Sequence, residues 1–371
     1  MKILLLADAN SSHVQKWAIG LANLGVEVAL FSFNRAQYDW YSQLKNLHIV
    51  YQPEANSDSI SVFQKLGYLL HLSRLKKAID LFRPDIIHAH YASSYGLLGA
   101  LSNFHPFLIS VWGSDVYNFP EKSFLHKSLL KYNLGKANRI LSTSEIMRVR
   151  IQQFTNKKIE VTPFGVDIER FSPKPKTNLL FKESDIVIGQ VKALEPKYGT
   201  EILLRSFALA VKQAPHLPLK LFLVGTGSLL NHLKNLANKM GIAEHVVFQG
   251  SVPHDLVPEY HNMIDIFVSV SIDDSESFGV SAVEACSCAK AVIVARTGGL
   301  KEVIVENETG LIVEKNNVEQ TTKAIIKFAE NVELRTAFGN RAREHVLKFY
   351  SWNENLLLMK SIYHEVLKVV K

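Results

Sequence analysis

The sequence predicts an α/β protein of two doubly wound domains, each with a mostly parallel sheet. Three observations support this fold class. Strand-like and helix-like patterns alternate from end to end. Proline and glycine cluster near the middle of the chain, at 163–175. The length of 371 residues suffices for two domains of ordinary size.

The first predicted domain spans residues 1–165. Short apolar runs predict buried strands at 2–7, 26–33, 85–88, 107–111 and 138–142. The segments between them carry helical spacing, at 13–24, 61–82, 93–103, 122–136 and 144–154. A linker follows, because periodicity lapses where Pro163, Gly165, Pro173 and Pro175 occur.

The second predicted domain spans residues 166–350. Its strands are expected at 186–191, 219–224, 245–248, 264–270, 291–294 and 310–313. Its helices are expected at 200–213, 228–240, 279–288, 317–330 and 333–348. The remaining residues, 351–371, predict a terminal helix, for which packing back on the first domain is one option.

Composition excludes several classes of protein. The hydrophobic content of 47% and the charged content of 21% are typical of globular chains. No apolar run reaches the roughly 18 residues of a membrane span, and the start MKILLLADAN predicts a strand rather than a signal peptide. Cys286 and Cys288 share one helical stretch with diverging side chains, so no disulfide is expected between them. A reducing cytoplasm fits this cysteine usage.

The net charge of +7 is unevenly distributed. Residues 1–170 hold 19 Lys and Arg against 13 Asp and Glu. Two basic helical stretches there have apolar neighbours, one with Lys65, Arg74, Lys76 and Lys77, the other with Lys122, Lys127, Lys131, Lys136 and Arg139. Such helices favour peripheral contact with an anionic membrane surface, and a solvated surface face is the alternative. Nucleic acid is not expected as a partner, because no reading motif or stacking platform accompanies the charge.

The run from Glu276 to Glu284 carries the most chemical information. A predicted strand precedes it and a predicted helix begins within it, so it is a strand–loop–helix junction. A helix start offers free N–H groups to phosphate, and Ser277 and Gly279 let the backbone approach an anion. Glu284 suits paired ribose hydroxyls, and Glu276 lies where a sugar ring would sit. The pattern predicts a nucleotide-sugar site; a charged helix end and a solvated glutamate are the alternatives.

Seven motifs in a fixed order resemble those of a known family. They are residues 163–167, 192–199, 224–228, 247–250, 276–284, 298–302 and 309–313. Over about residues 160–350 the chain resembles the retaining glycosyltransferases of family 4, the group 1 glycosyl transferases. The resemblance implies the GT-B fold, two facing Rossmann-like domains with a cleft between them. The first domain would be the acceptor side and the second would hold the nucleotide-sugar donor.

The resemblance also implies roles for single residues. Glu276 would contact the donor sugar at the reacting carbon, and Glu284 would hold the ribose. Lys192 and Lys197 would neutralise the diphosphate; the family usually has Arg at the first position and often Lys directly before the glycine at the second, where Tyr198 intervenes. Backbone groups near the nucleotide would come from Ser277, Phe278, Gly279, Val280, Gly225 and Gly227, with a structural turn as the alternative for the last two.

The first domain departs from the family pattern. Many members have His-Gly where this chain has Trp112-Gly113, and the indole cannot accept a hydrogen bond. His13, His88 and His90 are candidates for the missing histidine role, each predicted at a strand end or helix start, with a structural role as the alternative. Asp115 matches a family acid and is predicted to contact donor or acceptor. Further candidate contacts of sugar or acceptor are Ser12 and Trp112.

The expected reaction is sugar transfer from a nucleotide-diphosphate-sugar to a hydroxyl of a glycan or lipid-linked acceptor. The resemblance implies retention at the anomeric carbon, no metal and no cofactor, and a setting in bacterial cell-surface polysaccharide or lipid-linked glycan synthesis. Asp273 and Asp274 lack the spacing of the Asp-x-Asp metal motif and predict a solvated loop. Two alternatives stay open: another GT-B enzyme, such as an inverting transferase or an epimerase, and a non-catalytic subunit that binds a sugar nucleotide.

Overall fold

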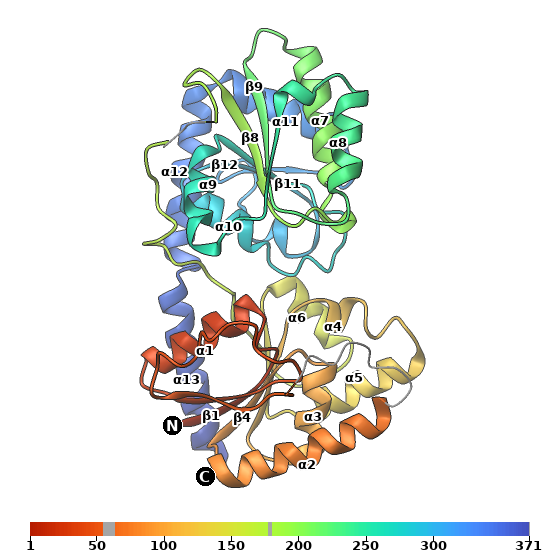
Figure 1. The fold of residues 1–371 in the computed structure, drawn as a ribbon, viewed down its shortest axis with the longest axis vertical. Coiled ribbons are helices and arrows are strands. Elements are labelled where there is room, and N and C mark those ends of the chain that lie inside the picture. The colour runs from red at the N-terminus through yellow and green to blue at the C-terminus, as the bar shows by residue number, and fades with distance from the viewer. Residues whose placement is uncertain (55–63, 177–179, 371) are drawn as a thin grey trace. The chain divides into compact units, whose positions relative to one another are not determined.

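The chain forms two compact units, each built on one parallel sheet (Figure 1). The computed structural model describes residues 1–54, 64–176 and 180–370. The first unit contains residues 1–163 and 354–371, and the second contains residues 164–353. The α/β class with two parallel-sheet domains is therefore confirmed.

The first unit has a seven-stranded sheet of order β3-β2-β1-β4-β5-β6-β7, in which every paired strand is parallel. Its strands are β1 (Lys2–Leu6), β2 (Glu27–Phe31), β3 (Leu47–Tyr51), β4 (Ile86–His90), β5 (Phe107–Val111), β6 (Arg139–Ser142) and β7 (Ile159–Val161). Its helices are α1 (Ser12–Asn23), α2 (Gln64–Phe82), α3 (Ser94–Ser102), α4 (Ser114–Tyr117), α5 (Phe124–Lys136) and α6 (Glu145–Gln152).

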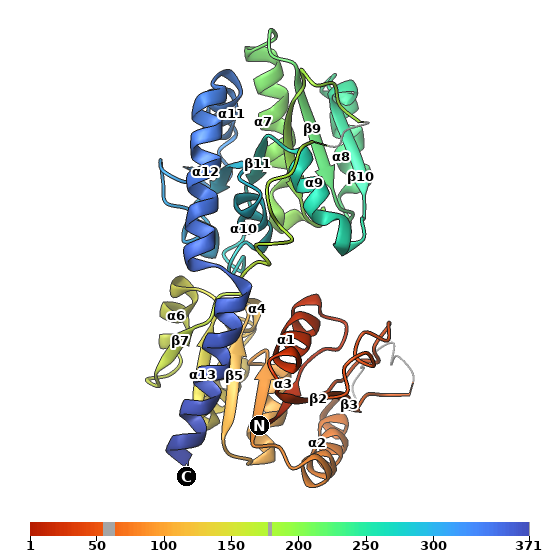
Figure 2. The ribbon, with the colours of Figure 1, turned by 90° about the vertical axis from the view of Figure 1, so that its left-hand side faces the viewer.

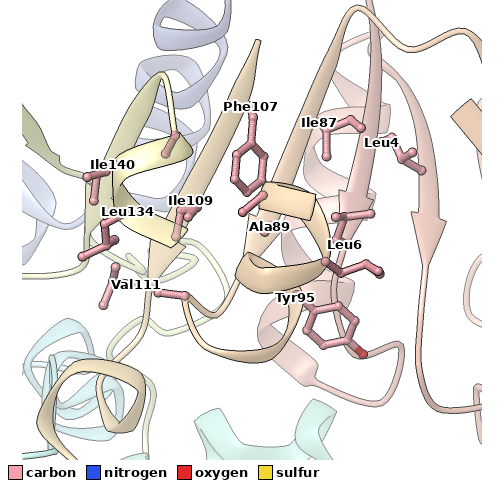
Figure 3. Packing of buried hydrophobic residues seen from close by; sticks show 14 of the residues in the cluster. Leu4, Leu6, Ile87, Ala89, Tyr95, Phe107, Ile109, Val111, Leu134 and Ile140 are labelled. Atoms are coloured by element: carbon pink, nitrogen blue, oxygen red, sulfur yellow. The ribbon is translucent and has the colours of Figure 1, made fainter. Parts of the chain in front are cut away.

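The core of the first unit lies between this sheet and its helices (Figure 3). Leu4, Ile87 and Ile109 come from neighbouring strands, and Leu98 and Leu134 come from α3 and α5. All five are fully buried. These strands are nearly continuous apolar runs because helices cover both faces of a parallel sheet, and such runs predict buried strands.

The second unit has a six-stranded parallel sheet of order β10-β9-β8-β11-β12-β13. Its strands are β8 (Ile186–Val191), β9 (Leu219–Val224), β10 (Val246–Gly250), β11 (Ile266–Ser269), β12 (Ala291–Ala295) and β13 (Leu311–Val313). Its helices are α7 (Thr200–Gln213), α8 (Leu230–Lys239), α9 (Val257–Met263), α10 (Val280–Ser287), α11 (Val318–Glu330) and α12 (Val332–Phe349). Within its described residues the unit also has four short 3-10 turns: η1 (Pro196–Tyr198), η2 (Ala243–His245), η3 (His254–Leu256) and η4 (Gly298–Lys301).

The last helix, α13 (Trp352–Val370), belongs mainly to the first unit (Figure 2). Tyr363 is fully buried, and its hydroxyl lies 2.7 Å from Nδ1 of His88 in β4. Lys360 Nζ donates to the carbonyl of Leu24 at 2.8 Å. The chain thus returns to complete the core of the unit in which it began.

The predicted strands and helices match the structure to within a few residues, and the differences have physical causes. Strand β3 was not predicted, because it is a half-exposed edge strand with alternating burial. Strand β7 has only three residues and lies at the other edge. Helices α4 and α9 were also not predicted, being only four and seven residues long. Residues 61–63 of the predicted helix 61–82 lie outside the described residues.

Candidate functional site

The candidate site of the second unit lies at the point where its strand order reverses. The chain runs from β8 outward through β9 to β10 and then crosses back to β11, on the other side of β8. In open parallel sheets, ligands bind beyond the carboxyl ends of the strands at such a point. Lys192 directly follows β8, Gly225 follows β9, and Glu276 lies in the loop after β11. The fold therefore gathers three of the predicted residues at one edge of one sheet.

Lys192 and Glu276 form an ion pair at this edge. Lys192 Nζ lies 2.5 Å from Oε2 of Glu276, and each side chain is only 12% exposed. The Ser271 hydroxyl donates to the same carboxylate oxygen at 3.2 Å. A half-buried charge is stable only with a partner, so each side chain holds the other in position. The sequence placed both residues in the site and did not predict that they pair.

Two hydrogen bonds from the turn η4 fix the loop that carries Glu276. Gly299 N donates to the Glu276 carbonyl at 2.7 Å, and Gly298 N donates to Oδ1 of Asp274 at 3.1 Å. A Cβ on Gly299 would lie 2.2 Å from the carbonyl oxygen of Ser277, so no larger residue fits without backbone movement. The double glycine after β12 is thus explained by the close approach of two loops.

Residues 277–280 connect this loop to α10. Phe278 is 2% exposed and packs against Phe164 and Tyr350, with ring centroids 6.2 and 5.3 Å apart. Its side chain is a core anchor, so only its backbone is a candidate for ligand contact. Helix α10 starts at Val280, and the next residue, Ser281, bonds the Val191 carbonyl at 2.6 Å. The helix start is thereby fixed beside the end of β8.

Glu284 is one turn further along α10 and has a partner that the sequence did not reveal. Its Oε2 lies 3.3 Å from Nε2 of His261, a fully buried residue of α9. The His261 ring lies between Phe171 and Phe267, with centroids 6.0 and 5.5 Å away. The sequence around His261 is mixed polar and apolar, so no local pattern marked this residue. His261 is therefore the partner of the Glu284 carboxylate, which lies on an otherwise apolar helix.

Gly225 and Gly227 follow β9 and pack closely against the segment that follows β8. A Cβ on Gly225 would lie 2.0 Å from the Lys192 carbonyl oxygen, and one on Gly227 would lie 2.5 Å from that of Leu194. Glu195, in the segment after β8, also joins the two segments, because its carboxylate accepts from Ser228 N at 2.9 Å. The glycine loop is therefore packed against the chain that carries Lys192. This geometry gives both glycines a structural role, and their predicted contact with the nucleotide stays a prediction.

Lys197 lies in the short turn η1 and is exposed. Its Nζ lies 4.8 Å from the ring centroid of Tyr198, and Lys192 Nζ lies 4.4 Å from the same centroid. The two lysines are five residues apart in the chain, and the ring brings them to one place. The structure therefore groups the predicted basic pair, with an aromatic side chain that the sequence did not assign to the site.

In the first unit, Asp115 is fully buried rather than presented to a ligand. Its carboxylate accepts from the N–H groups of Ala92 at 2.7 Å, Gly113 at 2.8 Å and Trp112 at 3.2 Å. Burial raises the pKa of Asp115 to about 6, and these donors oppose the rise. The geometry indicates that Asp115 holds the loop after β5 against the end of β4. Its predicted contact with substrate is not supported by this position.

His88 is not a ligand candidate in the structure. The predicted strand ended at residue 88, but β4 continues to His90, so His88 lies within the sheet and is fully buried. Its Nδ1 lies 2.7 Å from the Tyr363 hydroxyl and its Nε2 lies 2.8 Å from Oγ of Ser110. Burial lowers the pKa of His88 well below its usual value, so the ring is neutral and structural.

His13, His90 and Trp112 gather at the carboxyl ends of the neighbouring strands β1, β4 and β5 of the first sheet. The indole lies 4.8 Å from the His90 ring and 6.0 Å from the His13 ring, measured between centroids. Burial lowers the pKa of His90 to about 3, so its ring is neutral at pH 7. His90 Nδ1 has no hydrogen-bond partner among the residues described. Ser12 is exposed at the first position of α1, beside His13.

Comparison with known proteins identifies this arrangement. Residues 172–345 match the family model of glycosyl transferases group 1, and residues 2–144 match that of glycosyl transferase 4-like domains. The two matches divide between the two units and together cover most of the chain. The chain belongs to the group 1 glycosyltransferases of family 4. The resemblance of the motifs is thereby confirmed.

Relatives of this glycosyltransferase cover nearly its whole length. An uncharacterized glycosyltransferase of Methanocaldococcus jannaschii is 27% identical over 93% of each chain. Among solved structures, sucrose-phosphate synthase from Thermosynechococcus elongatus has a TM-score of 0.83 at 18% identity, covering all of both chains. Anabaena HepE in complex with UDP has a TM-score of 0.81 at 18% identity, covering 98% of this chain and all of that one. The two structural matches establish the GT-B fold.

Within residues 1–54, 64–176 and 180–370, no group of three His, Cys, Asp or Glu side chains is arranged to hold a metal ion. Asp274 instead pairs with Lys315 at 2.5 Å. No helix in the described part of the chain combines the length and the apolar character needed to cross a bilayer.

Proposed function

We propose that this glycosyltransferase transfers a sugar from a nucleotide-diphosphate-sugar to a hydroxyl acceptor, with retention at the anomeric carbon. The observation that carries the proposal is the grouping of Lys192, Lys197 and Glu276 at the strand-order reversal of the second unit. HepE, of the same fold, was solved with UDP and with UDP-glucose, which supports a nucleotide-sugar as the donor here.

The proposed mechanism assigns charge and hydrogen bonding to separate parts of the donor. The bond between the anomeric carbon and the diphosphate oxygen breaks, and negative charge grows on the departing diphosphate. Lys192, Lys197 and the start of α10 stabilise that charge. Glu276 accepts from sugar hydroxyls, and Glu284 accepts from the ribose hydroxyls. The acceptor oxygen bonds the same face of the carbon, and its proton passes to the leaving phosphate.

The first unit favours this front-face reaction over inversion. An inverting enzyme needs a general base beside the acceptor hydroxyl. Asp115 is fully buried and bonded to three N–H groups. His90 is 3% exposed with a pKa of about 3, which makes it a weak base at pH 7. Asp115 and His90 are therefore both poorly suited to the role of that base.

A thermal-shift panel of UDP-, GDP- and ADP-linked sugars tests the donor, because a bound donor raises the melting temperature by mass action. The donor that gives the largest shift is then incubated with a lipid-extract acceptor, and the product linkage is read by NMR. Retained anomeric configuration supports the proposal, and inverted configuration refutes the front-face reaction. Donor binding with no turnover in any extract would favour a non-catalytic subunit.

We also infer that the acceptor is a glycan or lipid-linked molecule met at an anionic membrane surface, in bacterial surface-polysaccharide or lipid-linked glycan synthesis. Helix α5 begins with two exposed apolar side chains, Phe124 (80%) and Leu125 (76%). Exposed lysines flank them at Lys122, Lys127 and Lys131. Apolar residues beside basic ones suit an interface of acyl chains and anionic headgroups. The other basic stretch, with Lys65, Arg74, Lys76 and Lys77, belongs to the predicted helix 61–82, of which residues 61–63 lie outside the described residues.

Vesicle sedimentation tests this surface. The wild type is expected to bind vesicles of phosphatidylglycerol and not vesicles of phosphatidylcholine, and the binding should weaken with salt. Replacing Phe124 and Leu125 by Ser should reduce the bound fraction severalfold. The matched control replaces Val332 by Ser, an exposed apolar residue at the start of α12. Equal binding by wild type and the α5 variant would refute a membrane role for this helix.

A further inference from the structure

Tyr198 contacts both lysines of the proposed diphosphate site. Its ring centroid lies 4.4 Å from Lys192 Nζ and 4.8 Å from Lys197 Nζ. An ammonium group within about 6 Å of an aromatic centroid is attracted by the negative face of the ring. Both ammonium groups are therefore held within 5 Å of the same ring centroid despite their mutual repulsion.

The backbone around Tyr198 is fixed by several hydrogen bonds. Ile272 N donates to the Lys197 carbonyl at 2.9 Å, which ties the turn η1 to the segment after β11. Tyr198 N donates to the Glu195 carbonyl at 3.0 Å. On the other side, Gln190 Nε2 lies 3.4 Å from the Tyr198 carbonyl oxygen. The ring is thus placed by the ends of β8 and β11, the strands that define the site.

Glu276 alone does not account for the position of both lysines. Its carboxylate pairs with Lys192, which is 12% exposed. Lys197 lies in an exposed turn, and a long exposed side chain loses much conformational entropy when it is fixed. The Tyr198 ring is a surface against which the Lys197 ammonium group is held before a ligand binds. A preorganised cation loses less entropy on binding than a mobile one.

We propose that Tyr198 is a positioning residue that presents the Lys192 and Lys197 ammonium groups together to the diphosphate of the donor. This inference rests on the proposed function, since it assumes that the two lysines bind diphosphate. The residue acts through the face of its ring rather than through its hydroxyl. Phenylalanine is therefore expected to replace it, and an aliphatic side chain is not.

The test compares Tyr198→Phe and Tyr198→Leu with the wild type by isothermal titration calorimetry. The probes are UDP, GDP and inorganic pyrophosphate, together with uridine and guanosine, which lack phosphate. One or more of the phosphate-bearing probes should bind the wild type. For such a probe, the affinity of Tyr198→Leu is expected to be about five- to tenfold lower than that of the wild type. Its affinity for the matching nucleoside should stay within twofold, and Tyr198→Phe should retain affinity for every probe.

The matched control is Phe349→Leu, which removes an aromatic ring 5.0 Å from Lys348 Nζ at the end of α12. It should leave all affinities unchanged. Equal loss of nucleoside and diphosphate affinity in Tyr198→Leu would show a merely structural role, and wild-type diphosphate affinity in that variant would also overturn the inference. If the wild type binds none of the phosphate-bearing probes, the proposed function itself fails, which is a separate and recognisable outcome.

Discussion

At the scale of single residues, the two glutamates of the candidate site, Glu276 and Glu284, each contact a basic or polar partner distant in sequence. Glu276 pairs with Lys192, 84 residues earlier. Glu284 contacts His261, 23 residues earlier. Lys192 directly follows β8, and His261 lies in α9, the helix that precedes β11. The direction of each carboxylate is thus a property of the folded unit and not of the local sequence.

Replacing Glu276 should separate catalysis from nucleotide binding. Glu276→Ala removes the proposed sugar contact, so turnover should fall on the order of 100-fold. In the wild type, the Glu276 carboxylate competes with the diphosphate for the Lys192 ammonium group. The affinity of the variant for free UDP or GDP should therefore be equal to that of the wild type or higher. Steady-state kinetics and calorimetry measure the two effects. Glu306→Ala, a control at an exposed ion pair, should alter neither. Near-normal turnover in Glu276→Ala would remove this residue from the mechanism.

His261→Phe should weaken only the ribose side of the site. The ring lies between two phenylalanines, so phenylalanine fits the surroundings and the fold should be retained. Loss of one hydrogen bond to Glu284 corresponds to about 1 kcal/mol, or roughly fivefold in affinity. The expected loss is therefore about fivefold for the nucleoside, with no change for inorganic pyrophosphate. Calorimetry with both probes decides, and an equal loss for the two would contradict an orienting role.

Asp115 should make the stability of the first unit depend on pH. Its pKa is raised from 3.8 to about 6 by burial, so the folded unit favours the protonated form. The stabilisation is therefore complete below pH 3.8 and is lost as pH rises through about 6, a change of roughly 3 kcal/mol. Asp115→Asn cannot ionise and lacks this change. Urea unfolding at pH 4.5 and 7.5 should show the advantage of wild type over the variant shrinking with pH; a constant difference would contradict the assignment.

At the scale of elements, close approaches between loops define the site more than any helix does. The turn η4 and the loop after β11 are joined by the bond from Gly299 N to the Glu276 carbonyl. A Cβ on Gly299 would meet backbone at 2.2 Å, which no side-chain rotation relieves. Gly299→Ala should therefore displace the loop, cost on the order of 1–3 kcal/mol of unfolding free energy and abolish turnover.

Gly135→Ala is the matched control for that substitution. Gly135 lies in α5, and a Cβ there meets nothing within 4 Å. Alanine in a helix is more favourable than glycine, so this variant should be neutral or more stable by about 0.5–1 kcal/mol. Thermal unfolding and turnover are measured for both variants. Unchanged turnover in Gly299→Ala would show that the contact between the two loops does not position Glu276.

The sequence predicted elements well where burial is continuous and poorly where it is partial. Strands such as 186–191 and 219–224 were predicted to the residue, because apolar runs in a covered parallel sheet leave a strong pattern. The edge strands β3 and β7 leave a weak sequence pattern, because β3 is only partly buried and β7 has three residues. Motifs supplied the candidate site residues of the second unit, and their contacts with a ligand stay predictions. The Lys192–Glu276 pair and His261 were not predicted, because spatial pairs distant in sequence leave no local pattern. The Tyr198 ring contacts are local in sequence, and they depend on side-chain directions that the sequence does not specify.

At the scale of the whole molecule, the chain enters the second unit at residue 164 and leaves it at residue 353, so the first unit is closed by its own C-terminal helix. Trp352 N donates to the Val166 carbonyl at 2.8 Å, which joins the outgoing and incoming segments. The residues that follow bury Met359, Ile362 and Tyr363 in the first unit. Changes in α13 should therefore act on the first unit and spare the proposed donor site.

Tyr363→Phe tests this division of the molecule. The variant leaves Nδ1 of His88 buried without the hydroxyl that lies 2.7 Å away, at a cost of about 1–3 kcal/mol. Hydrogen exchange should quicken in peptides of β4, β5 and α13 and stay unchanged in the second unit, and nucleotide affinity should be retained. Tyr350→Phe, which removes a 3.2 Å bond to the Glu302 carbonyl, should affect only the second unit. Faster exchange throughout both units in either variant would show that they unfold as one cooperative body rather than as two.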